Sequence, residues 1–537
     1  MSSKKIKEKL STISLKKTKN IKNINVNKNK LTASHLNDII NDLESIENTK
    51  YIKSNSNSNI VNNCSLAINK NLSYNNINTN LTLESFKNGS RIFNNKTEYT
   101  KFDFNDKDKL FIEFKQLMYE NLLLKDNFEE LINEDYNIKI KSCLICSFVY
   151  DDLFFEPIIN KFNIKSFIVK DKINEGHNVN LTKINDNITY IYPKIDFILN
   201  WGKFHSKLII FKFDDFIRII VPSANFTNID WYHLGQVIWF QDFYRLKDKE
   251  NNNKEGKEFL NYLEEFVITP YLKYSKKQLS DINIDLSIYN YSNANAYLVS
   301  TISGRFKSNI NNYGLLRVNS ILSYKIKGFA NTDDFNNNEL LCQCSSFGKI
   351  KEKWISKVLE NFKCNPYNSI NNNSKESKNK SKSKKIINNY NFECFKVYYP
   401  SIEYINKSKN GHSLSNCLFL DEATFNLFNI NFYNLVIKSK YNFAHQIFHS
   451  KIFLIRDKTT KSTKAVYVGS HNLSASAWGS LELNDTQISS GNYELGVILK
   501  NVEDYNLYDF ILSDYTNEQR FNCNNNKSKN LNYPWVL

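Results

Sequence analysis

The sequence lacks any uninterrupted apolar run long enough to cross a bilayer, and its amino terminus, MSSKK, lacks the apolar stretch of a secretory signal. It also lacks a paired set of cysteines, because its nine cysteines are an odd number scattered along the chain. These absences argue against a membrane-spanning protein and against a secreted disulfide framework. We therefore expect a soluble protein of a reducing intracellular compartment.

Acidic residues are too few to balance the basic ones. There are 55 Asp and Glu against 71 Lys and Arg, which leaves a formal net charge of +16 and a pI near 9.1. Such a chain should be drawn to a polyanion, because neutralising phosphates releases their condensed counterions. Charge alone does not separate nucleic acid from an anionic membrane surface.

Two cysteines, Cys143 and Cys146, have a C-x-x-C spacing but no second pair of ligands in view. They lie in the apolar run KSCLICSFV, which is typical of a strand. Because structural zinc sites need four ligands, we expect buried strand thiols at these positions.

The chain of 537 residues is long enough for two domains and a tail. Residues 1–100 are rich in Asn, Lys and Ser, and we expect a disordered tail there, because such a stretch buries too little apolar surface to offset its ordering entropy. Strand-like and helix-like runs then alternate, which predicts α/β domains with parallel strand pairing. We place one domain at 101–292 and another at 293–537, with a low-complexity insertion at 371–389.

An octamer recurs almost unchanged in the two predicted domains. Residues 204–211 read FHSKLIIF, and residues 448–455 read FHSKIFLI. Each copy is followed by a turn of small residues with an Asn, and then by a polar residue before an apolar strand. The repeated set is His205, Lys207, Asn225 and Gln236 in the first copy, and His449, Lys451, Asn472 and Glu494 in the second.

The repeated residues suit chemistry at a phosphate. In a strand, positions i and i+2 share a face, so His205 and Lys207 should point the same way, as should His449 and Lys451. An imidazole can attack phosphorus or move a proton near neutral pH, while a Lys holds the negative oxygens. Two copies brought face to face would supply both a nucleophile and an acid for the leaving group.

A single His-x-Lys on a strand would most often have no catalytic role, and it is the duplication that favours one. The remaining histidines have no repeated setting, and we expect them at the surface or in packing; they are His35, His177, His233, His412, His445 and His471. His445 and His471 carry a weak claim to the site because they are close in sequence to the second motif.

The duplicated set resembles the tyrosyl-DNA phosphodiesterase family, a branch of the phospholipase D superfamily, from about Phe102 to the C-terminus. In most of that superfamily an Asp follows the motif lysine by five positions, where this chain has Lys212 and Arg456. Replacement of that Asp by the later Asn225 and Asn472 marks the branch. The resemblance implies two α-β-α sandwich domains in a pseudo-two-fold arrangement, with one site in the cleft between them.

The resemblance also implies roles. His205 resembles the nucleophile that forms a phosphohistidine, and His449 resembles the proton donor and acceptor. Lys207, Lys451 and the two Asn residues would bind the phosphate. Gln236 and Glu494 would orient the imidazoles, and the sequence leaves open which of them serves which histidine.

The implied substrate is a single- or double-stranded DNA 3′ end that carries a tyrosine or a topoisomerase I peptide, cleaved without metal or cofactor to leave a 3′-phosphate. We further expect a monomer that acts in DNA repair in the nucleus and has no membrane partner. The resemblance also implies residues that contact DNA. Trp201 would stack on a base, and the other implied contacts are Arg305, Ser345, Ser346 and Ser474.

Two rival functions stay open. A lipid-cleaving phospholipase D is disfavoured by the missing Asp in both motifs, and a catalytically silent DNA-end binder is disfavoured by the intact His, Lys and Asn in both copies. The sequence departs from the family after the Pro534–Trp535 pair, where the chain ends at Leu537. We therefore expect the end of the peptide-side groove to be incomplete or built differently.

Overall fold

The structure is a computed structural model, and it describes the following parts of the chain: residues 92–95, 111–112, 114–119, 138–172, 180–195, 202–247, 250–329, 335–367, 392–409, 411–436, 446–502, 518–521 and 533–536. The insertion predicted at 371–389 and most of the tail predicted at 1–100 lie outside these residues, as do Trp201, His35, His177 and His445.

Within the described residues, the first half of the molecule contains a nine-stranded sheet. Its strands, in spatial order, are β2 (Phe111–Ile112), β1 (Ile92–Asn95), β9 (Val237–Tyr244), β8 (Phe216–Pro222), β7 (Leu208–Lys212), β3 (Ser142–Ser147), β4 (Lys165–Lys170), β6 (Ile188–Ile191) and β5 (Leu181–Lys183).

The second half contains a seven-stranded sheet among its described residues. In spatial order it comprises β10 (Ala296–Thr301), β19 (Glu494–Leu499), β16 (Thr463–Gly469), β15 (Ile452–Asp457), β12 (Asn338–Gln343), β13 (Phe395–Tyr399) and β14 (Phe432–Asn434). A small separate sheet has the order β11 (Gly304–Phe306), β18 (Gln487–Ser490) and β17 (Ser480–Glu482).

The two large sheets repeat one topology. The order β9-β8-β7-β3-β4-β6 in the first sheet matches β19-β16-β15-β12-β13-β14 in the second. In both, the first three of the five pairings are antiparallel and the last two are parallel. The sheets are therefore mixed, so the prediction of parallel pairing holds for only one side of each sheet. Strands β16 and β19 lie against β8 and β9, so equivalent strands meet where the halves join.

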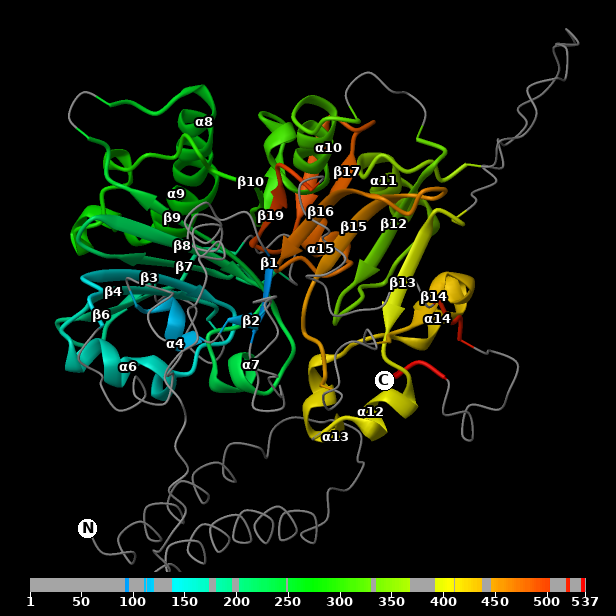
Figure 1. Ribbon diagram of the computed structural model, residues 1–537, viewed down its shortest axis with the longest axis horizontal. Helices are drawn as coiled ribbons and strands as arrows, with labels where there is room; N and C mark the ends of the chain where they lie inside the picture. The colour runs from blue at the N-terminus through cyan, green and yellow to red at the C-terminus, as the bar shows by residue number, and fades with distance from the viewer. Residues whose placement is uncertain are drawn as a thin grey trace, which may run out of the picture. The chain divides into compact units, whose positions relative to one another are not determined.

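Helices cover both faces of the first sheet (Figure 1). The α-helices of this half are α4 (Phe114–Leu117), α6 (Asp152–Lys161), α7 (Asn228–Tyr232), α8 (Lys254–Leu263) and α9 (Thr269–Leu272), with a π-helical turn at Glu264–Ile268. Successive residues of β3 point to opposite faces, because strand side chains alternate. Leu144 packs in the core that includes α8 and α9, whereas Cys143 packs in the core that includes α6.

The second half carries α10 (Gly314–Tyr324), α11 (Glu352–Asn361), α12 (Ile402–Lys407), α13 (Gly411–Leu414), α14 (Glu422–Phe428) and α15 (Ala475–Trp478). Short 3₁₀ turns lie at Lys273–Ser275, Leu279–Ile282, Leu286–Ile288, Ile310–Asn312, Ser415–Cys417 and Asn429–Asn431. One continuous apolar core joins α8 and α9 of the first half to the sheet of the second. Of the helices within the described ranges, none is both long and apolar enough to span a membrane.

Strand β1 corrects the predicted start of order. Ile92–Asn95 lies inside the range predicted as tail, yet it pairs antiparallel with β9 and parallel with β2. The pairing is favourable because it satisfies backbone groups at the edge of β9 that would otherwise be unpaired. Four residues, IFNN, within an Asn- and Lys-rich stretch gave no periodic signal. The division at 292/293 stays a prediction, and the two large sheets use strands on opposite sides of it.

Candidate active site

Backbone hydrogen bonds hold each His-x-Lys motif against the opposite half. The amide of His205 donates to the carbonyl oxygen of Tyr493 at 3.0 Å, and the amide of His449 donates to the carbonyl oxygen of Gly235 at 2.9 Å. Tyr493 and Gly235 directly precede the two polar residues that were predicted to orient the imidazoles. Each histidine therefore meets the orienting residue of the other half of the chain.

The motifs were predicted to lie in strands. The structure places them just before β7 and β15 rather than inside these strands. Ser206, between the two motif residues, points away into the core, with its hydroxyl 2.5 Å from the phenol oxygen of Tyr271. This alternation is what an extended chain produces. Lys207 Nζ donates to the carbonyl oxygen of His205 at 2.8 Å. The His205 ring lies 5.3 Å from the ring of Phe148 and Lys207 Nζ lies 5.9 Å from the same ring, so the two motif side chains share one side of the chain, as predicted.

His205 is oriented by Glu494, whose Oε2 lies 2.8 Å from His205 Nδ1. The buried carboxylate also accepts from Ser470 Oγ at 2.5 Å. Burial by itself would raise the pKa of Glu494, but His205, His471 and Lys207 together outweigh it and hold this pKa at about 2. An ionised carboxylate at Nδ1 keeps the proton on that nitrogen, so Nε2 carries the lone pair that can attack phosphorus.

His449 is oriented chiefly by Asp230, a residue that the sequence did not single out. Asp230 Oδ1 lies 3.0 Å from His449 Nδ1, whereas Gln236 Nε2 is 3.4 Å from the same nitrogen. Gln236 Nε2 also donates to Asp230 Oδ1 at 2.9 Å, and its Oε1 accepts from Ser223 Oγ at 2.6 Å. Because the ring nitrogen and the amide are both donors here, Gln236 acts on His449 through Asp230.

A serine beneath each orienting residue completes the repeat. Ser223 Oγ accepts from the amide of Val237 at 3.0 Å, and Ser470 Oγ accepts from the amide of Leu495 at 2.9 Å. Each hydroxyl then donates to the orienting side chain of its own half. The halves differ at two positions of this arrangement: Gln236 stands where the second half has Glu494, and Asp230 stands where the second half has Ala477.

Lys207 and Lys451 are both fully buried, and each ammonium donates to the carbonyl oxygen of its own histidine. Burial lowers the pKa of Lys207 to about 7 and that of Lys451 to about 8. Burial and the two lysines lower the pKa of both imidazoles, and that of His449 falls to about 4. A bound anion would reverse these effects, because it stabilises every cation around it.

The two asparagines have their amide oxygens tied to the protein. Asn225 Oδ1 accepts from the backbone amide of Val149 at 3.3 Å, and Asn472 Oδ1 accepts from that of Ser346 at 3.2 Å. This fixes which end of each side chain is the NH2 group. In the first half, the NH2 group of Asn225 lies beside a carboxylate, with Nδ2 3.4 Å from Asp230 Oδ1.

Comparison with known proteins shows the family to which the chain belongs. The model of the tyrosyl-DNA phosphodiesterase family matches residues 125–535, which is well over half of the chain. The chain belongs to the tyrosyl-DNA phosphodiesterase family. The tyrosyl-DNA phosphodiesterase 1 of Arabidopsis thaliana is 24% identical over 308 residues, or 56% of this chain and 47% of that protein. The match thus spans about half the length of that curated relative.

Solved structures of the same family share the fold. A yeast tyrosyl-DNA phosphodiesterase 1 mutant has a TM-score of 0.51 at 16% identity, covering 76% of this chain and 89% of that one. A second yeast mutant has a TM-score of 0.50 at 16% identity, covering 77% and 90%. The predicted fold class, two phospholipase D-type α/β domains, is confirmed.

Residues predicted to contact DNA in this family member lie in different settings. Ser345 is buried and its hydroxyl faces Asn472 Oδ1 at 3.4 Å, so it supports an active-site residue. Ser346 is half-buried beside it, whereas Ser474 caps α15 by accepting from the amide of Ala477. Arg305 is exposed on β11, with its Nε 3.6 Å from Glu482 Oε2. These contacts leave the predicted DNA roles as predictions.

We call the two sets of repeated His, Lys and Asn residues the clamp: His205, Lys207, Asn225, His449, Lys451 and Asn472. The structure also shows the surroundings of a histidine and two cysteines outside the clamp. His471 is fully buried, with Nε2 2.9 Å from Thr301 Oγ1 and Nδ1 bonded to Tyr467, so it packs as predicted. Cys143 and Cys146 are buried thiols on β3, which confirms that prediction. Among the described residues, no cluster of three or more His, Cys, Asp or Glu could hold a metal ion.

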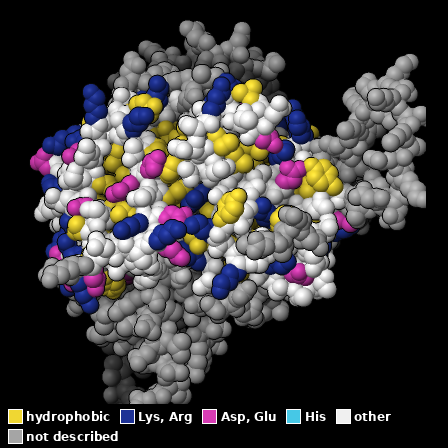
Figure 2. Space-filling model, turned by 90° about the horizontal axis from the view of Figure 1, so that it is seen from above, with side chains coloured by type: hydrophobic (Ala, Val, Ile, Leu, Met, Phe, Trp, Pro, Cys, Tyr) yellow, Lys and Arg dark blue, Asp and Glu magenta, His cyan; other side chains and the backbone are white. Residues whose placement is uncertain are grey.

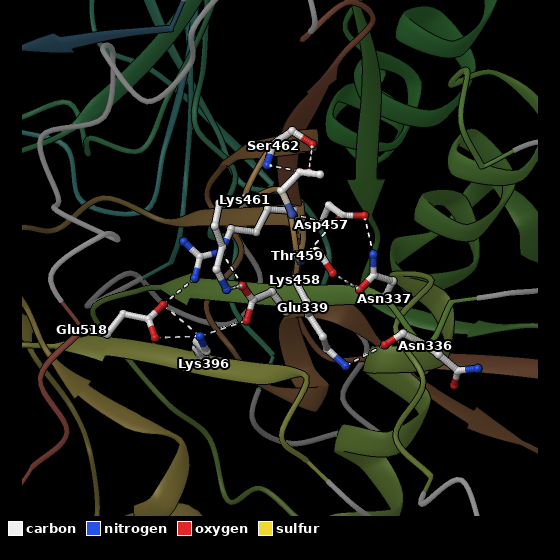
Figure 3. A network of polar contacts seen from close by, with 12 residues as sticks. Asn336, Asn337, Glu339, Lys396, Asp457, Lys458, Thr459, Lys461, Ser462 and Glu518 are labelled. Carbon is white, nitrogen blue, oxygen red and sulfur yellow. Dashed lines mark hydrogen bonds and ion pairs between the residues drawn. The ribbon is translucent and has the colours of Figure 1, made fainter.

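The two positions where most of the phospholipase D superfamily has Asp do not reach the site. Lys212 is the last residue of β7, and its Nζ donates to the carbonyl oxygen of Asn283. Arg456, at the far end of β15, is buried and ion-paired with Glu339 and Glu518. Figure 3 shows Glu339 and Glu518 on either side of Lys396, within a wider polar network. These substitutions therefore serve the fold of this family member.

The sequence missed Asp230 for a physical reason. Thr227 caps α7, and its hydroxyl accepts from the amide of Asp230 at 3.1 Å, so TNID reads as an ordinary helix start. The residue also has no counterpart in the second motif. The one available signal was an acidic residue close after a motif Asn, and that signal is weak.

Proposed function

We propose that this member of the tyrosyl-DNA phosphodiesterase family hydrolyses the phosphodiester bond between a DNA 3′ end and a tyrosine, such as that of trapped topoisomerase I, and other 3′ adducts. The observation that carries the proposal is the crossed pairing of His205 with Glu494 and of His449 with Asp230. Both pairings occupy Nδ1 and leave two Nε2 atoms for one phosphate between two buried lysines.

In the first step, His205 Nε2 attacks phosphorus and the bond from phosphorus to the tyrosyl oxygen breaks. The bonding electrons move to that oxygen, which takes a proton from His449 Nε2. The lowered pKa of His449 would keep it neutral in the empty site, but the phosphate charge favours the imidazolium. The acid is therefore charged when substrate is bound.

In the second step, water attacks the phosphohistidine and gives its proton to His449. The bond between phosphorus and Nε2 breaks, its electrons return to His205, and the DNA leaves with a 3′-phosphate. Lys207 and Lys451 stabilise the negative oxygens throughout, with the Asn472 amide as a further donor. We propose that no metal takes part, because these fixed cations supply the charge stabilisation.

The direct test is cleavage of a single-stranded oligonucleotide with a 3′-phosphotyrosine in excess EDTA. The native chain should release tyrosine and leave a 3′-phosphate, and His205→Ala should abolish this. His412→Ala, which changes an exposed histidine outside the clamp, is the matched control and should retain activity. Cleavage only with added divalent metal, or hydrolysis of phospholipid vesicles in its place, would refute the proposal.

The setting of the reaction is part of the proposal. We infer that the chain acts as a monomer in the nucleus on single- or double-stranded DNA ends, consistent with its net charge of +16. A DNA-end binder without catalysis is distinguished in the same assay, because it would bind the oligonucleotide and release no tyrosine.

A further inference from the structure

A cavity of about 410 Å³ lies between the two halves and shares a wall with the candidate active site. Tyr493 lines it, and the carbonyl oxygen of this residue accepts from the His205 amide at 3.0 Å. The volume falls within the range of about 300–1,000 Å³ that is usual for small-molecule pockets, which often form at domain interfaces. None of the four predicted DNA-contact residues that the structure describes, Arg305, Ser345, Ser346 and Ser474, lines this cavity.

Aromatic rings form much of the lining. Phe306 and Tyr313 of the second half stack with ring centroids 4.3 Å apart, and Phe266 of the first half meets Tyr313 edge-on at 5.6 Å. Tyr274 adds another ring from the first half, and this residue is 41% exposed. Flat apolar surfaces of this kind suit an aromatic ligand.

Two lysines flank the exposed ring of Tyr274. Lys194 Nζ lies 5.5 Å from its centroid and Lys273 Nζ lies 5.8 Å from it. Both side chains are exposed, and neither forms an ion pair with any residue in the described ranges. The lining holds one carboxylate, Glu265, so two cations face one anion at this cavity.

On the face seen in Figure 2, charge does not mark a path for a nucleic acid strand. Lys and Arg side chains lie scattered there among Asp and Glu and form no continuous basic patch. A local site that combines rings with unpaired cations is therefore more informative than net charge. Nucleotides carry an aromatic base beside a phosphate, which is the combination that Tyr274 and its two lysines match.

We propose that this cavity receives a nucleobase of the DNA strand close to the scissile bond, with the base stacked on Tyr274 and a neighbouring phosphate held by Lys194 and Lys273. The inference rests on the proposed function and adds a binding site to it. An aromatic side chain of the attached peptide is the competing occupant, but a peptide does not place a fixed negative charge beside each ring.

The test uses 3′-phosphotyrosyl oligonucleotides in which one nucleotide at a time is replaced by an abasic residue. For the native chain, an abasic residue at one position near the 3′ end should raise KM by roughly 5- to 150-fold, the factor that corresponds to about 1–3 kcal/mol of stacking. With Tyr274→Ala, the ratio between abasic and intact substrates at that position should fall toward one. Tyr274→Trp should restore it, and Tyr324→Ala, an 80% exposed tyrosine on α10, should leave it at the native value.

Binding of the same oligonucleotides without tyrosine, measured by fluorescence anisotropy, separates the two proposals. Cleavage without any Tyr274-dependent position would overturn the base site and leave the proposed function standing. Tyr274-dependent binding without cleavage would support the base site and refute the function. A Tyr274→Ala defect that follows the length of the attached peptide rather than any base would assign the cavity to peptide and overturn the inference.

Discussion

At the scale of single residues, the two clamp histidines differ in what holds their Nδ1. His205 meets one carboxylate, Glu494, whereas His449 meets Asp230, which Gln236 holds in turn. Each histidine thus has one carboxylate at Nδ1, but only the carboxylate on His449 is also held by a glutamine amide. A carboxylate at Nδ1 stabilises the imidazolium, so Asp230 supports the acid role that we propose for His449.

Asp230→Asn should therefore weaken acid catalysis in particular. We expect kcat on the tyrosyl substrate to fall by about a hundredfold or more, the scale of general acid–base catalysis. The loss should be much smaller on a 3′-(4-nitrophenyl phosphate) ester, whose leaving group needs no proton. Asp214→Asn, at an exposed carboxylate, is the control. Equal losses on both substrates would contradict the acid assignment.

The buried lysines predict an unusual pH profile. Lys207 and Lys451 have pKa values of about 7 and about 8 because burial disfavours their charge. As pH rises through these values the empty site loses positive charge, so kcat/KM, which reports the free protein, should fall between about pH 7 and 8. A basic limb above pH 9.5, near the ordinary lysine pKa of about 10.4, would contradict this.

Sequence could predict the clamp residues because they are duplicated, and duplication is visible without a structure. His205, Lys207 and Asn225 each have a counterpart, and all six residues of the two sets lie at the site. Asp230 could not be predicted in the same way, because Ala477 stands at its counterpart and its helix-capping bond explains it equally well. Only the structure shows which orienting residue serves which histidine.

At the scale of elements, β16 and β19 approach closely behind the site. Gly469 pairs with Gly496, and a Cβ at Gly496 would lie 2.1 Å from the Tyr467 hydroxyl oxygen. The absence of both side chains makes room for the Tyr467 ring, whose hydroxyl bonds His471 beside Asn472. The packing of these strands thus fixes the turn that carries an active-site residue.

Gly496→Ala should displace Tyr467 and lower the free energy of unfolding by about 1–3 kcal/mol, the usual effect of overpacking. Thermal or urea unfolding measures the change, and Thr463→Ala, at a partly exposed position of β16, should lie within about 0.5 kcal/mol of native. Stability equal to native in Gly496→Ala would show that the close approach is not a constraint.

Sequence predicts long apolar elements better than short ones. Strand-like and helix-like runs were predicted to alternate, and such runs form β13 (Phe395–Tyr399) and α6 (Asp152–Lys161). The four-residue strand β1 was not predicted. It forms by pairing with β9, which is far away in the sequence, and its own residues show no strand pattern.

At the scale of the whole molecule, neither half holds a complete site. Each histidine takes its orienting carboxylate from the other half, and one apolar core joins the halves. Residues 1–292 and 293–537 produced separately should each be inactive on the tyrosyl oligonucleotide. Coexpression should restore cleavage only in fractions that contain both pieces by size-exclusion chromatography. Activity in either piece alone would contradict the crossed arrangement.

The most direct test of the central claim is to trap the covalent intermediate. His449→Ala should be mixed with an oligonucleotide 3′-(4-nitrophenyl phosphate), because nitrophenolate can leave without an acid while water is poorly activated. The account predicts a protein–DNA adduct by intact mass, mapped by peptide mass spectrometry to His205 and lost when His205 is also changed to alanine. An adduct at any other residue, or complete turnover by the native chain with no adduct in the variant, would contradict it.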